Sequence, residues 1–463
     1  MPDNDLSLIA HLMRRAGFGA RRDELEAYSA RKYDAVVEDV LYPERAPSLE
    51  EDILDRYNGW DKDKGVAASW MYRMVNSERH LEEKIALFWH HVFATGTNKS
   101  EHDPSHMGEI EMFRRIGLSD MRTLLIGLSK DPAMIYWLDN NENHKDEPNE
   151  NYGREILELF SMGVGNYTET DIKMAGRAFT GWTFTQPIPL YPTGIYNTSF
   201  VYKEDDHDDS EKTFLGETGC FNGEDIVDII VKQPATARFI SRHMYNFFVA
   251  DEPQVPAWGD KPPGDPEAID ALVGAYLDSD GDIRSMLRVL FNSDFFKEAR
   301  FKRVKTPAEL VAGVIKLVGT DRFPAPGFVR YAQAATLMGQ QLFNPPTVEG
   351  WHTGQEWING GTLNERVNFA VNQVGDASKP GLRDIVDRLG STGGSVTPAE
   401  LVDRCLDLVG PLDVSDDARD GLLEYANAVG ELKLGTKAER EQSQLHVVRM
   451  IQLIVATREY QFA

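Results

Sequence analysis

The sequence predicts a mainly α-helical protein, a large multi-helix globular domain with a small β-hairpin excursion near residues 183–222. Apolar residues recur every three or four positions through most of the 463 residues, which is the period of an amphipathic helix. The pattern changes only between Trp182 and Gly223, where prolines, aromatics and short alternating segments occur. Such segments are typical of strands joined by turns.

The composition limits the classes of partner. Lys and Arg number 49 against 74 Asp and Glu, a net charge of -25, which repels nucleic acid and anionic membranes. No segment approaches the roughly 18 apolar residues that a membrane span needs. Cys220 and Cys405 lie far apart and imply neither a disulfide framework nor a cysteine zinc site. We expect a soluble protein with no nucleic-acid partner and no membrane span.

The first hundred residues predict short helices over 5–45 and a long helical segment from about Ala67 to Ala94. The chain starts without a basic and then apolar signal segment, so the expected location is cytoplasmic. The second half of the long segment carries apolar residues on more than one side. His90 lies among them, and we expect its side chain to be at least partly buried.

Residues 148–163 form the segment with the densest polar chemistry, with two asparagines, three glutamates and an arginine. Pro148 and Asn149 predict a turn, and Gly163 is expected to end the helix that follows. One side of this helix is apolar. The other side places four polar residues within one sector of roughly 100°, namely Asn151, Arg154, Glu155 and Glu158. A solvated face is the plain interpretation, but a buried His90 needs a polar partner, so we expect this sector to face His90 and Arg177.

Three further segments complete the polar region. The loop over 139–147 is rich in asparagine, including Asn140, and precedes the helix. A helix with a capping box at its start, Thr168 to Asp171, carries Arg177 on its polar side. The acidic segment over 204–209 surrounds His207 with five acids, yet it lacks the spacing and the glycine of an EF-hand loop, and such loops are mostly solvated.

Helices are expected to resume after residue 223 and to supply much of the core. A glycine- and tryptophan-rich turn over 347–361 interrupts them. Trp351 and Trp357 could stack on a sugar ring, although such tryptophans more often close the end of a helical core. The segment 391–397 is the best linker candidate. We therefore expect a main domain over 1–390 and a C-terminal helical cap over 398–463, which could belong to the same domain.

No nucleophile elbow, phosphate-binding glycine loop, dinucleotide-binding fingerprint or HExxH motif is present. The remaining hypothesis is a polar site that combines histidine, carboxylates and arginine, which suits acid–base chemistry or a divalent metal. The expected catalytic residues are His90, Glu155, Glu158 and Arg177. The expected substrate-binding residues are Asn140, Asn149, Asn151, Arg154 and Trp351. The expected metal ligands are His90, Glu155, His207 and Asp208.

Several motifs carry a family resemblance that spans roughly residues 8–375. They are Phe88-Trp89-His90, the segment from Pro148 to Gly165, Arg177 to Trp182, His207-Asp208 followed by Lys212 to Gly216, Pro234 to Phe239, and Pro345-Pro346 with Gly350-Trp351. In this order they resemble the bacterial domain-of-unknown-function family 1800. The resemblance implies a mostly helical protein with no established activity. It also implies genes placed beside those of phosphatase- or sulfatase-like proteins, and frequent export.

Three functional hypotheses follow. The first is an enzyme of unassigned reaction, with or without a divalent metal as cofactor. The second is a non-catalytic partner that binds or matures the neighbouring phosphatase- or sulfatase-like protein, with the polar cluster as a buried structural network. The third is glycan binding through Trp351 and Trp357.

Overall fold

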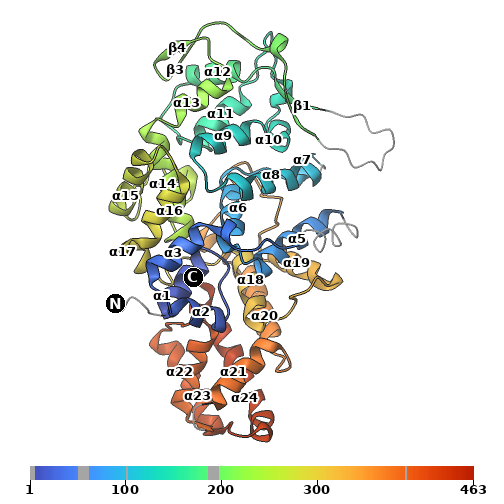
Figure 1. Cartoon of the computed structure of the whole chain (residues 1–463), viewed down its shortest axis with the longest axis vertical. Helices are drawn as coiled ribbons and strands as arrows, with labels where there is room; N and C mark the ends of the chain where they lie inside the picture. The colour runs from blue at the N-terminus through green and yellow to red at the C-terminus, as the bar shows by residue number, and fades with distance from the viewer. Residues whose placement is uncertain (1–5, 51–61, 101–102, 186–197, 392–393) are drawn as a thin grey trace. The chain divides into compact units, whose positions relative to one another are not determined.

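The computed structural model describes residues 6–50, 62–100, 103–185, 198–391 and 394–463. It confirms the predicted fold class, because helices dominate and the strands form small antiparallel pairs (Figure 1). The chain forms two compact units. The first contains residues 1–81, 296–342 and 353–463, and the second contains residues 82–295 and 343–352.

The first unit is built from helices contributed by both ends of the chain. Its early and middle helices are α1 (Leu6–Arg15), α2 (Arg22–Ser29), α3 (Tyr33–Leu41), η1 (Pro43–Arg45), α5 (Lys62–Asn76), α18 (Pro307–Val318), η5 (Pro326–Phe328) and α19 (Val329–Leu337). The later elements are η6 (Gly354–Trp357), α20 (Gly360–Val374), α21 (Pro380–Gly390), β5 (Ser395–Val396), α22 (Pro398–Val409), α23 (Asp416–Val429), β6 (Leu432–Lys433), α24 (Lys437–Val455) and η7 (Glu459–Gln461).

Helix α18 forms the centre of the first unit and packs against α5, α19, α20 and α21. Its start is specified locally, because Thr306 and Glu309 form a reciprocal capping box around Pro307. Its end is specified by Gly319, whose φ of 69° suits a residue without a side chain. Almost every residue between them is buried, so α18 is a core helix rather than an amphipathic surface helix.

The second unit begins with α6 (His80–Val92), whose first residues overlap the boundary. It continues through α7 (Thr97–Ser100), α8 (Asp103–Ile116), α9 (Met121–Ser129), α10 (Pro132–Trp137), η2 (Asn140–Glu142), α11 (Asn151–Glu158) and α12 (Glu169–Ala178). After the strands come α13 (Gly223–Ile230), α14 (Pro234–Phe248), η4 (Val255–Ala257), α15 (Pro266–Asp278), α16 (Ile283–Asn292) and α17 (Asp294–Lys297).

The β-hairpin excursion lies near residues 183–222, as predicted, and consists of two separate pairs within this unit. Strand β1 (Trp182–Phe184) pairs with β2 (Phe200–Tyr202), and β3 (Lys212–Phe214) pairs with β4 (Glu217–Gly219). The short helix η3 (Glu204–Asp206) lies between the pairs. The prolines at 187, 189 and 192 fall outside the described residues. In the first unit β5 pairs with β6, and β5 lies within the segment 391–397 expected to be a linker. The expected division into 1–390 and 398–463 stays a prediction.

Aromatic packing around α6 builds the core of the second unit. Trp89 stacks on Phe93 with ring centroids 4.9 Å apart, and its indole N–H donates to the Gly117 carbonyl at 2.8 Å. Phe88 packs against Phe247 and Phe248 of α14. These large rings bury apolar area while the single polar group finds a partner. Helix α6 is therefore buried on several sides, as its sequence predicts.

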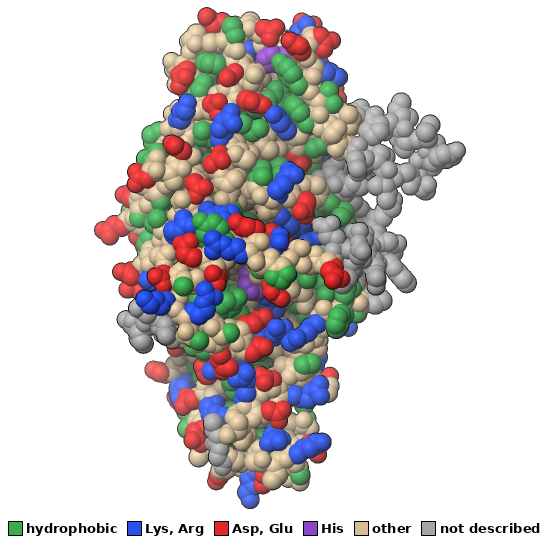
Figure 2. All heavy atoms as spheres, viewed as in Figure 1, with side chains coloured by type: hydrophobic (Ala, Val, Ile, Leu, Met, Phe, Trp, Pro, Cys, Tyr) green, Lys and Arg blue, Asp and Glu red, His purple; other side chains and the backbone are tan. Residues whose placement is uncertain are grey.

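One face of the molecule shows how its charged side chains are distributed. On the face drawn in Figure 2, Lys and Arg side chains are interspersed with Asp and Glu. The net charge of -25 is therefore not gathered into one acidic patch on this face. None of the described helices is long and apolar enough to cross a membrane.

Candidate functional site

Helix α11 carries the polar sector identified in the sequence, and it is shorter than predicted. The α-helix ends at Glu158 rather than at Gly163. Past that point Phe160 N–H bonds to the Glu155 carbonyl, five residues back, at 3.0 Å, a wider spacing than that of an α-helix. Its apolar side is fully buried at Tyr152, Ile156 and Leu157. The amphipathic pattern is therefore confirmed, and only its C-terminal boundary is corrected.

Two glycines bring α11 against α12. A Cβ atom added at Gly153 would lie 2.7 Å from the Gly176 backbone nitrogen and 2.8 Å from the Ile172 carbonyl oxygen. Contacts this short exclude any side chain. The two helices therefore meet backbone to backbone at these glycines. Arg154, Glu155 and Glu158 on α11 are partly exposed.

The partners of this polar sector differ from those expected. Arg154 forms an ion pair with Glu169 at 2.9 Å, and Glu158 accepts a hydrogen bond from the Tyr167 hydroxyl at 2.6 Å. Burial, and then Glu158, raise the pKa of Tyr167, so this phenol keeps its proton and remains a donor. Neither contact involves His90 or Arg177. We call Arg154, Glu155, Glu158, Tyr167 and Glu349 the α11 face.

Glu155 is the group of the α11 face that is closest to exchanging a proton at neutral pH. Burial raises its pKa most, the neighbouring Glu158 raises it further, and Glu349 adds to the effect, while Arg154 opposes them; the result is a pKa of about 7. Glu349 is exposed and belongs to the 343–352 segment of the same unit. A carboxyl at this pKa is half protonated near neutrality, which suits general acid–base chemistry.

The side chains of the asparagines at and before the start of α11 form hydrogen bonds with backbone groups. Asn140 is buried and donates to the carbonyls of Phe179 and Trp182 at 3.2 and 2.9 Å. Asn149 Oδ1 accepts from the Asn151 N–H at 2.9 Å at the start of α11. Asn143, absent from the expected site, accepts from the Asn149 N–H at 2.8 Å. These contacts position the loop and the helix start. A substrate-binding role for Asn140, Asn149 and exposed Asn151 stays a prediction.

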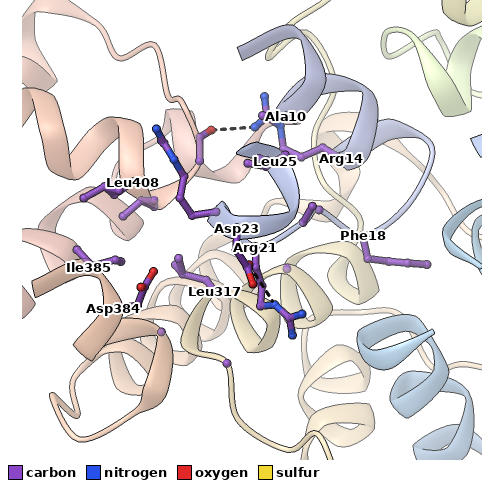
Figure 3. Close-up of a pocket in the computed structure, with 18 of the residues that line it drawn as sticks. Ala10, Arg14, Phe18, Arg21, Asp23, Leu25, Leu317, Asp384, Ile385 and Leu408 are labelled. Atoms are coloured by element: carbon purple, nitrogen blue, oxygen red, sulfur yellow. Dashed lines mark hydrogen bonds and ion pairs between the residues drawn. The ribbon is translucent and has the colours of Figure 1, made fainter. Parts of the chain in front are cut away.

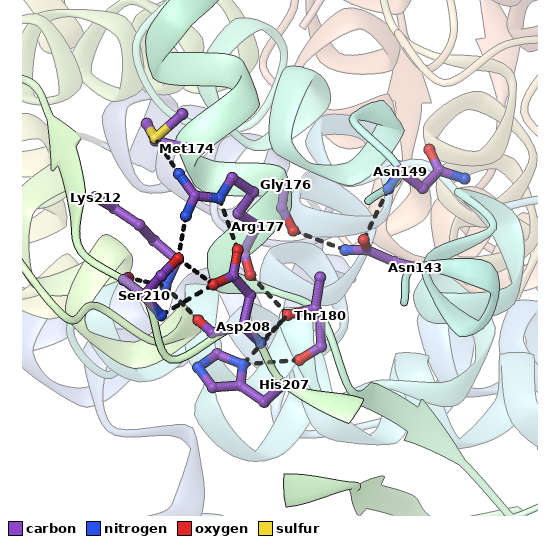
Figure 4. A network of polar contacts seen from close by, with 10 residues as sticks. All are labelled: Asn143, Asn149, Met174, Gly176, Arg177, Thr180, His207, Asp208, Ser210 and Lys212. Carbon is purple, nitrogen blue, oxygen red and sulfur yellow. Dashed lines mark hydrogen bonds and ion pairs between the residues drawn. The ribbon is translucent and has the colours of Figure 1, made fainter. Parts of the chain in front are cut away.

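Arg177 binds the acidic segment rather than the glutamates of α11 (Figure 4). Its Nε lies 2.7 Å from Asp208 Oδ2, and Asp208 N–H donates to Thr180 Oγ1 at 2.9 Å. Burial alone would raise the pKa of Asp208, but hydrogen bonds from Arg177 and Ser210 outweigh it and hold that pKa below its usual range. The pair fastens the segment after η3 onto the end of α12.

His207 belongs to the same network. It is buried, and its Nδ1 lies 3.0 Å from the Thr180 carbonyl oxygen (Figure 4). Within the described part of the chain, no group of three or more His, Cys, Asp or Glu side chains is placed to hold a metal ion. The residues expected as ligands lie in three different surroundings. The structure does not bring these residues together, and a divalent-metal site formed by His90, Glu155, His207 and Asp208 stays a prediction.

His90 lies in a buried cluster that the sequence analysis did not assemble. Its Nδ1 is 3.5 Å from Glu109 Oε2 on α8, and Glu109 accepts from the Thr95 hydroxyl at 2.6 Å. The same hydroxyl lies 3.3 Å from His106 Nδ1. Burial lowers the pKa of His90 to about 3. We call His90, Thr95, His106, Glu109 and Asp131 the buried cluster.

Burial acts on the carboxyls of the buried cluster as it does on His90, and it disfavours their charged forms. Burial raises the pKa of Glu109, and burial together with the nearby Glu109 raises the pKa of Asp131. Asp131 also caps α10 by accepting from the Ala133 N–H at 2.9 Å. Burial therefore shifts the pKa of both carboxyls and of the imidazole towards the uncharged form, because a buried site disfavours charge.

Trp351 closes this region within the second unit. Its ring meets His90 edge-on with centroids 5.4 Å apart, and it stacks beside His91 at 6.4 Å. Gly350 allows the approach, because a Cβ atom there would lie 2.2 Å from the His91 carbonyl oxygen. Trp351 and Trp357 are only 4% and 5% exposed. This burial favours the core-closing interpretation, while substrate binding by Trp351 and glycan binding stay predictions.

Comparison with known proteins gives one family. The sequence profile described as "Protein of unknown function (DUF1800)" matches residues 11–462. The chain belongs to the DUF1800 family. No curated protein and no solved structure matches it. Membership of DUF1800 confirms the resemblance carried by the sequence motifs and extends it beyond residue 375.

The structure of this DUF1800 protein shows which signal could have revealed the buried cluster. His106 and Glu109 lie three residues apart, and Ile110 and Phe113 follow on the same stripe of α8. Polar residues that occupy positions on an apolar stripe are candidates for a buried network. Their partner, Thr95, lies in the turn before α7 and carries no periodicity that could assign it.

Proposed function

We propose that the second unit is an acid–base enzyme whose proton-transfer group is Glu155 on the α11 face. The observation that supports this proposal best is a partly exposed carboxyl with a pKa of about 7, flanked by Glu158 and Glu349. Such a group accepts a proton from water or a substrate hydroxyl and returns it to a leaving group without a large free-energy cost at neutral pH.

The neighbours of Glu155 have distinct tasks in this proposal. Arg154 is partly exposed and paired with an exposed glutamate, Glu169, which a negatively charged substrate group can displace. Tyr167 supplies a fixed donor to Glu158 and holds that carboxylate in place. The buried cluster, whose carboxyls have raised pKa values, supports α6 and α8 and takes no part in proton transfer. The reaction class to test first is hydrolysis of polar substrates.

Activity screening with a matched pair of variants tests this function. Chromogenic phosphate esters, sulfate esters, carboxylic esters and glycosides are incubated with the wild type, Glu155→Gln and the exposed control Glu111→Gln. The expected result is hydrolysis of one class with a pH profile that inflects near 7, lost in Glu155→Gln and kept in Glu111→Gln. Equal activity of both variants on every hydrolysed substrate would contradict the assignment of Glu155.

A second candidate is the non-catalytic partner of a phosphatase- or sulfatase-like protein. It is favoured by a specific observation: Arg177, His207, Asn140 and His90 all have contacts typical of a structural network. Co-expression with the neighbouring gene product and size-exclusion chromatography test it. A stable complex at micromolar concentration is expected, and two separate peaks would count against this candidate.

A further inference from the structure

Helix α18 borders a cavity of about 300 Å³ that lies within the first unit (Figure 3). Every residue of α18 is buried except Gly313 and Leu317, and both of these line the cavity. They lie four residues apart and therefore on the same side of the helix. The partly exposed strip of this core helix is thus the strip that faces the cavity.

Gly313 has no packing reason to be a glycine. A Cβ atom added there would meet, among the described residues, only the Phe18 carbonyl oxygen, at an ordinary 3.6 Å. Gly381, which also lines the cavity, differs, because a Cβ atom there would lie 1.9 Å from the Leu317 carbonyl oxygen. Glycine weakens a helix relative to alanine, and protein cores are otherwise close-packed. Gly313 therefore keeps space open at a cost to its helix, which indicates that the space has a use.

Four helices contribute apolar side chains to the wall of the cavity. They are Leu25 from α2, Leu317 from α18, Ile385 from α21 and Leu408 from α22 (Figure 3). An engineered apolar cavity of about 150 Å³ binds benzene, so a cavity of about 300 Å³ has room for a ligand roughly twice that size. Apolar walls of this kind hold the hydrocarbon body of a small ligand.

Several charged side chains of the cavity already form ion pairs. They are Arg22 with Asp407 at 2.5 Å, Arg388 with Asp384 at 2.8 Å, and Arg21 with Glu24 at 3.0 Å. Arg14 Nη1 and Lys305 Nζ donate to the carbonyls of Gly410 and Tyr460, at 2.9 and 2.7 Å. A charged ligand would have to compete for these groups or be buried without a partner, which is costly. An uncharged ligand leaves all these contacts in place.

We propose that this cavity binds a small, uncharged and largely apolar molecule of the class of medium-chain alcohols. Its hydrocarbon part lies against Leu25, Leu317 and Ile385, in the space that Gly313 leaves open. The backbone carbonyls and carboxylates of the wall accept a hydrogen bond from its hydroxyl group without any change of charge. The site lies in the first unit, so it is independent of the acid–base chemistry proposed for Glu155 in the second.

Titration calorimetry of the full chain with 1-octanol tests the proposal, with 1-butanol and octanoate as comparison ligands. Octanol is expected to bind one to one. Each methylene group removed should weaken binding by about fourfold, so butanol should bind at least about fiftyfold more weakly. Octanoate should bind at least about tenfold more weakly than octanol at pH 7, because its carboxylate would be buried without a partner.

Gly313→Leu and Gly421→Leu form a matched pair of variants. Leucine at position 313 fills the cavity and should abolish octanol binding. Gly421 lies in α23 outside the cavity, with no described atom within 4 Å of an added Cβ. Gly421→Leu should therefore keep an octanol affinity within about twofold of the wild type. Thermal unfolding shows whether both variants are folded.

Methyl NMR of the wild type gives a second measurement that needs no variant. Bound octanol should show nuclear Overhauser effects to the methyl groups of Leu25 and Ile385. Four results would each overturn the proposal: no saturable octanol binding by the wild type, tighter binding of octanoate than of octanol, unchanged octanol binding by folded Gly313→Leu, or no Overhauser effect between octanol and Ile385.

Discussion

Glu155 and Glu109 are two glutamates of the second unit with pKa values raised first by burial, yet their surroundings differ. Glu109 is completely buried, beside His90 and bonded to Thr95. Glu155 is partly exposed, and the charges of Glu158 and Glu349 add to the rise in its pKa. A raised pKa therefore marks two different situations. In one the proton is locked in a dry network, and in the other it can exchange with solvent or substrate.

The buried cluster should respond most strongly to mutation. Glu109→Ala removes a buried side chain and leaves a cavity beside Thr95 and His90, and we expect a loss of about 3 kcal/mol in the free energy of unfolding. Glu109→Gln keeps the shape and mimics the protonated acid, so it should cost less than about 1 kcal/mol. Urea denaturation measures both. Equal losses for the two variants would show that Glu109 is ionised in the folded protein.

The pH dependence of stability also tests whether Glu109 holds its proton in the folded protein. The folded protein binds the Glu109 proton more tightly than the unfolded chain, because burial raises its folded pKa. The stability that depends on this proton is complete below the unfolded pKa of about 4.3, and it decreases as the pH rises towards the raised folded value. Glu109→Gln should lack that decrease when unfolding is measured from pH 4 to pH 8.

The next largest loss of stability is expected from disturbing the packing of α11 on α12, which sets the orientation of the α11 face. Gly153→Ala forces a methyl group against the backbone of α12, and we expect it to destabilise by about 1–3 kcal/mol. Gly108→Ala is the control. It lies in α8 with no atom within 4 Å of the added carbon, so it should stabilise by up to about 1 kcal/mol. A neutral Gly153→Ala would refute the close contact of the two helices.

The Arg177 pair should matter more than the exposed pair on α11. Arg177→Met leaves the partly buried Asp208 without its cation, and we expect a loss of about 1–2 kcal/mol at pH 7. Arg154→Met breaks an exposed pair with Glu169 and should cost less than about 1 kcal/mol. Since Arg177 lowers the folded pKa of Asp208, its stabilisation is present above the unfolded pKa of about 3.9 and disappears as the pH falls through the folded value. Thermal unfolding at pH 7 and pH 2.5 measures both effects.

The sequence predicted the helices, the position of the strand pairs and the amphipathic pattern of α11, because these depend on local periodicity and capping. It did not predict which polar groups meet. Arg177 and Asp208 were both expected in the site, but their pairing depends on how η3 and the strands return the chain to α12. The meeting of His90 with Glu109 depends on the packing of α6 against α8, which no spacing within either helix specifies.

The pKa of Glu155 tests the central claim most directly. Carbon-detected NMR of carboxyl-labelled protein, with Glu155→Gln to assign the signal, follows its titration from pH 3 to pH 9. The account predicts an inflection near 7, the pKa that its surroundings produce. An inflection near the ordinary glutamate value of about 4.3 would contradict it and remove the basis for acid–base chemistry on the α11 face.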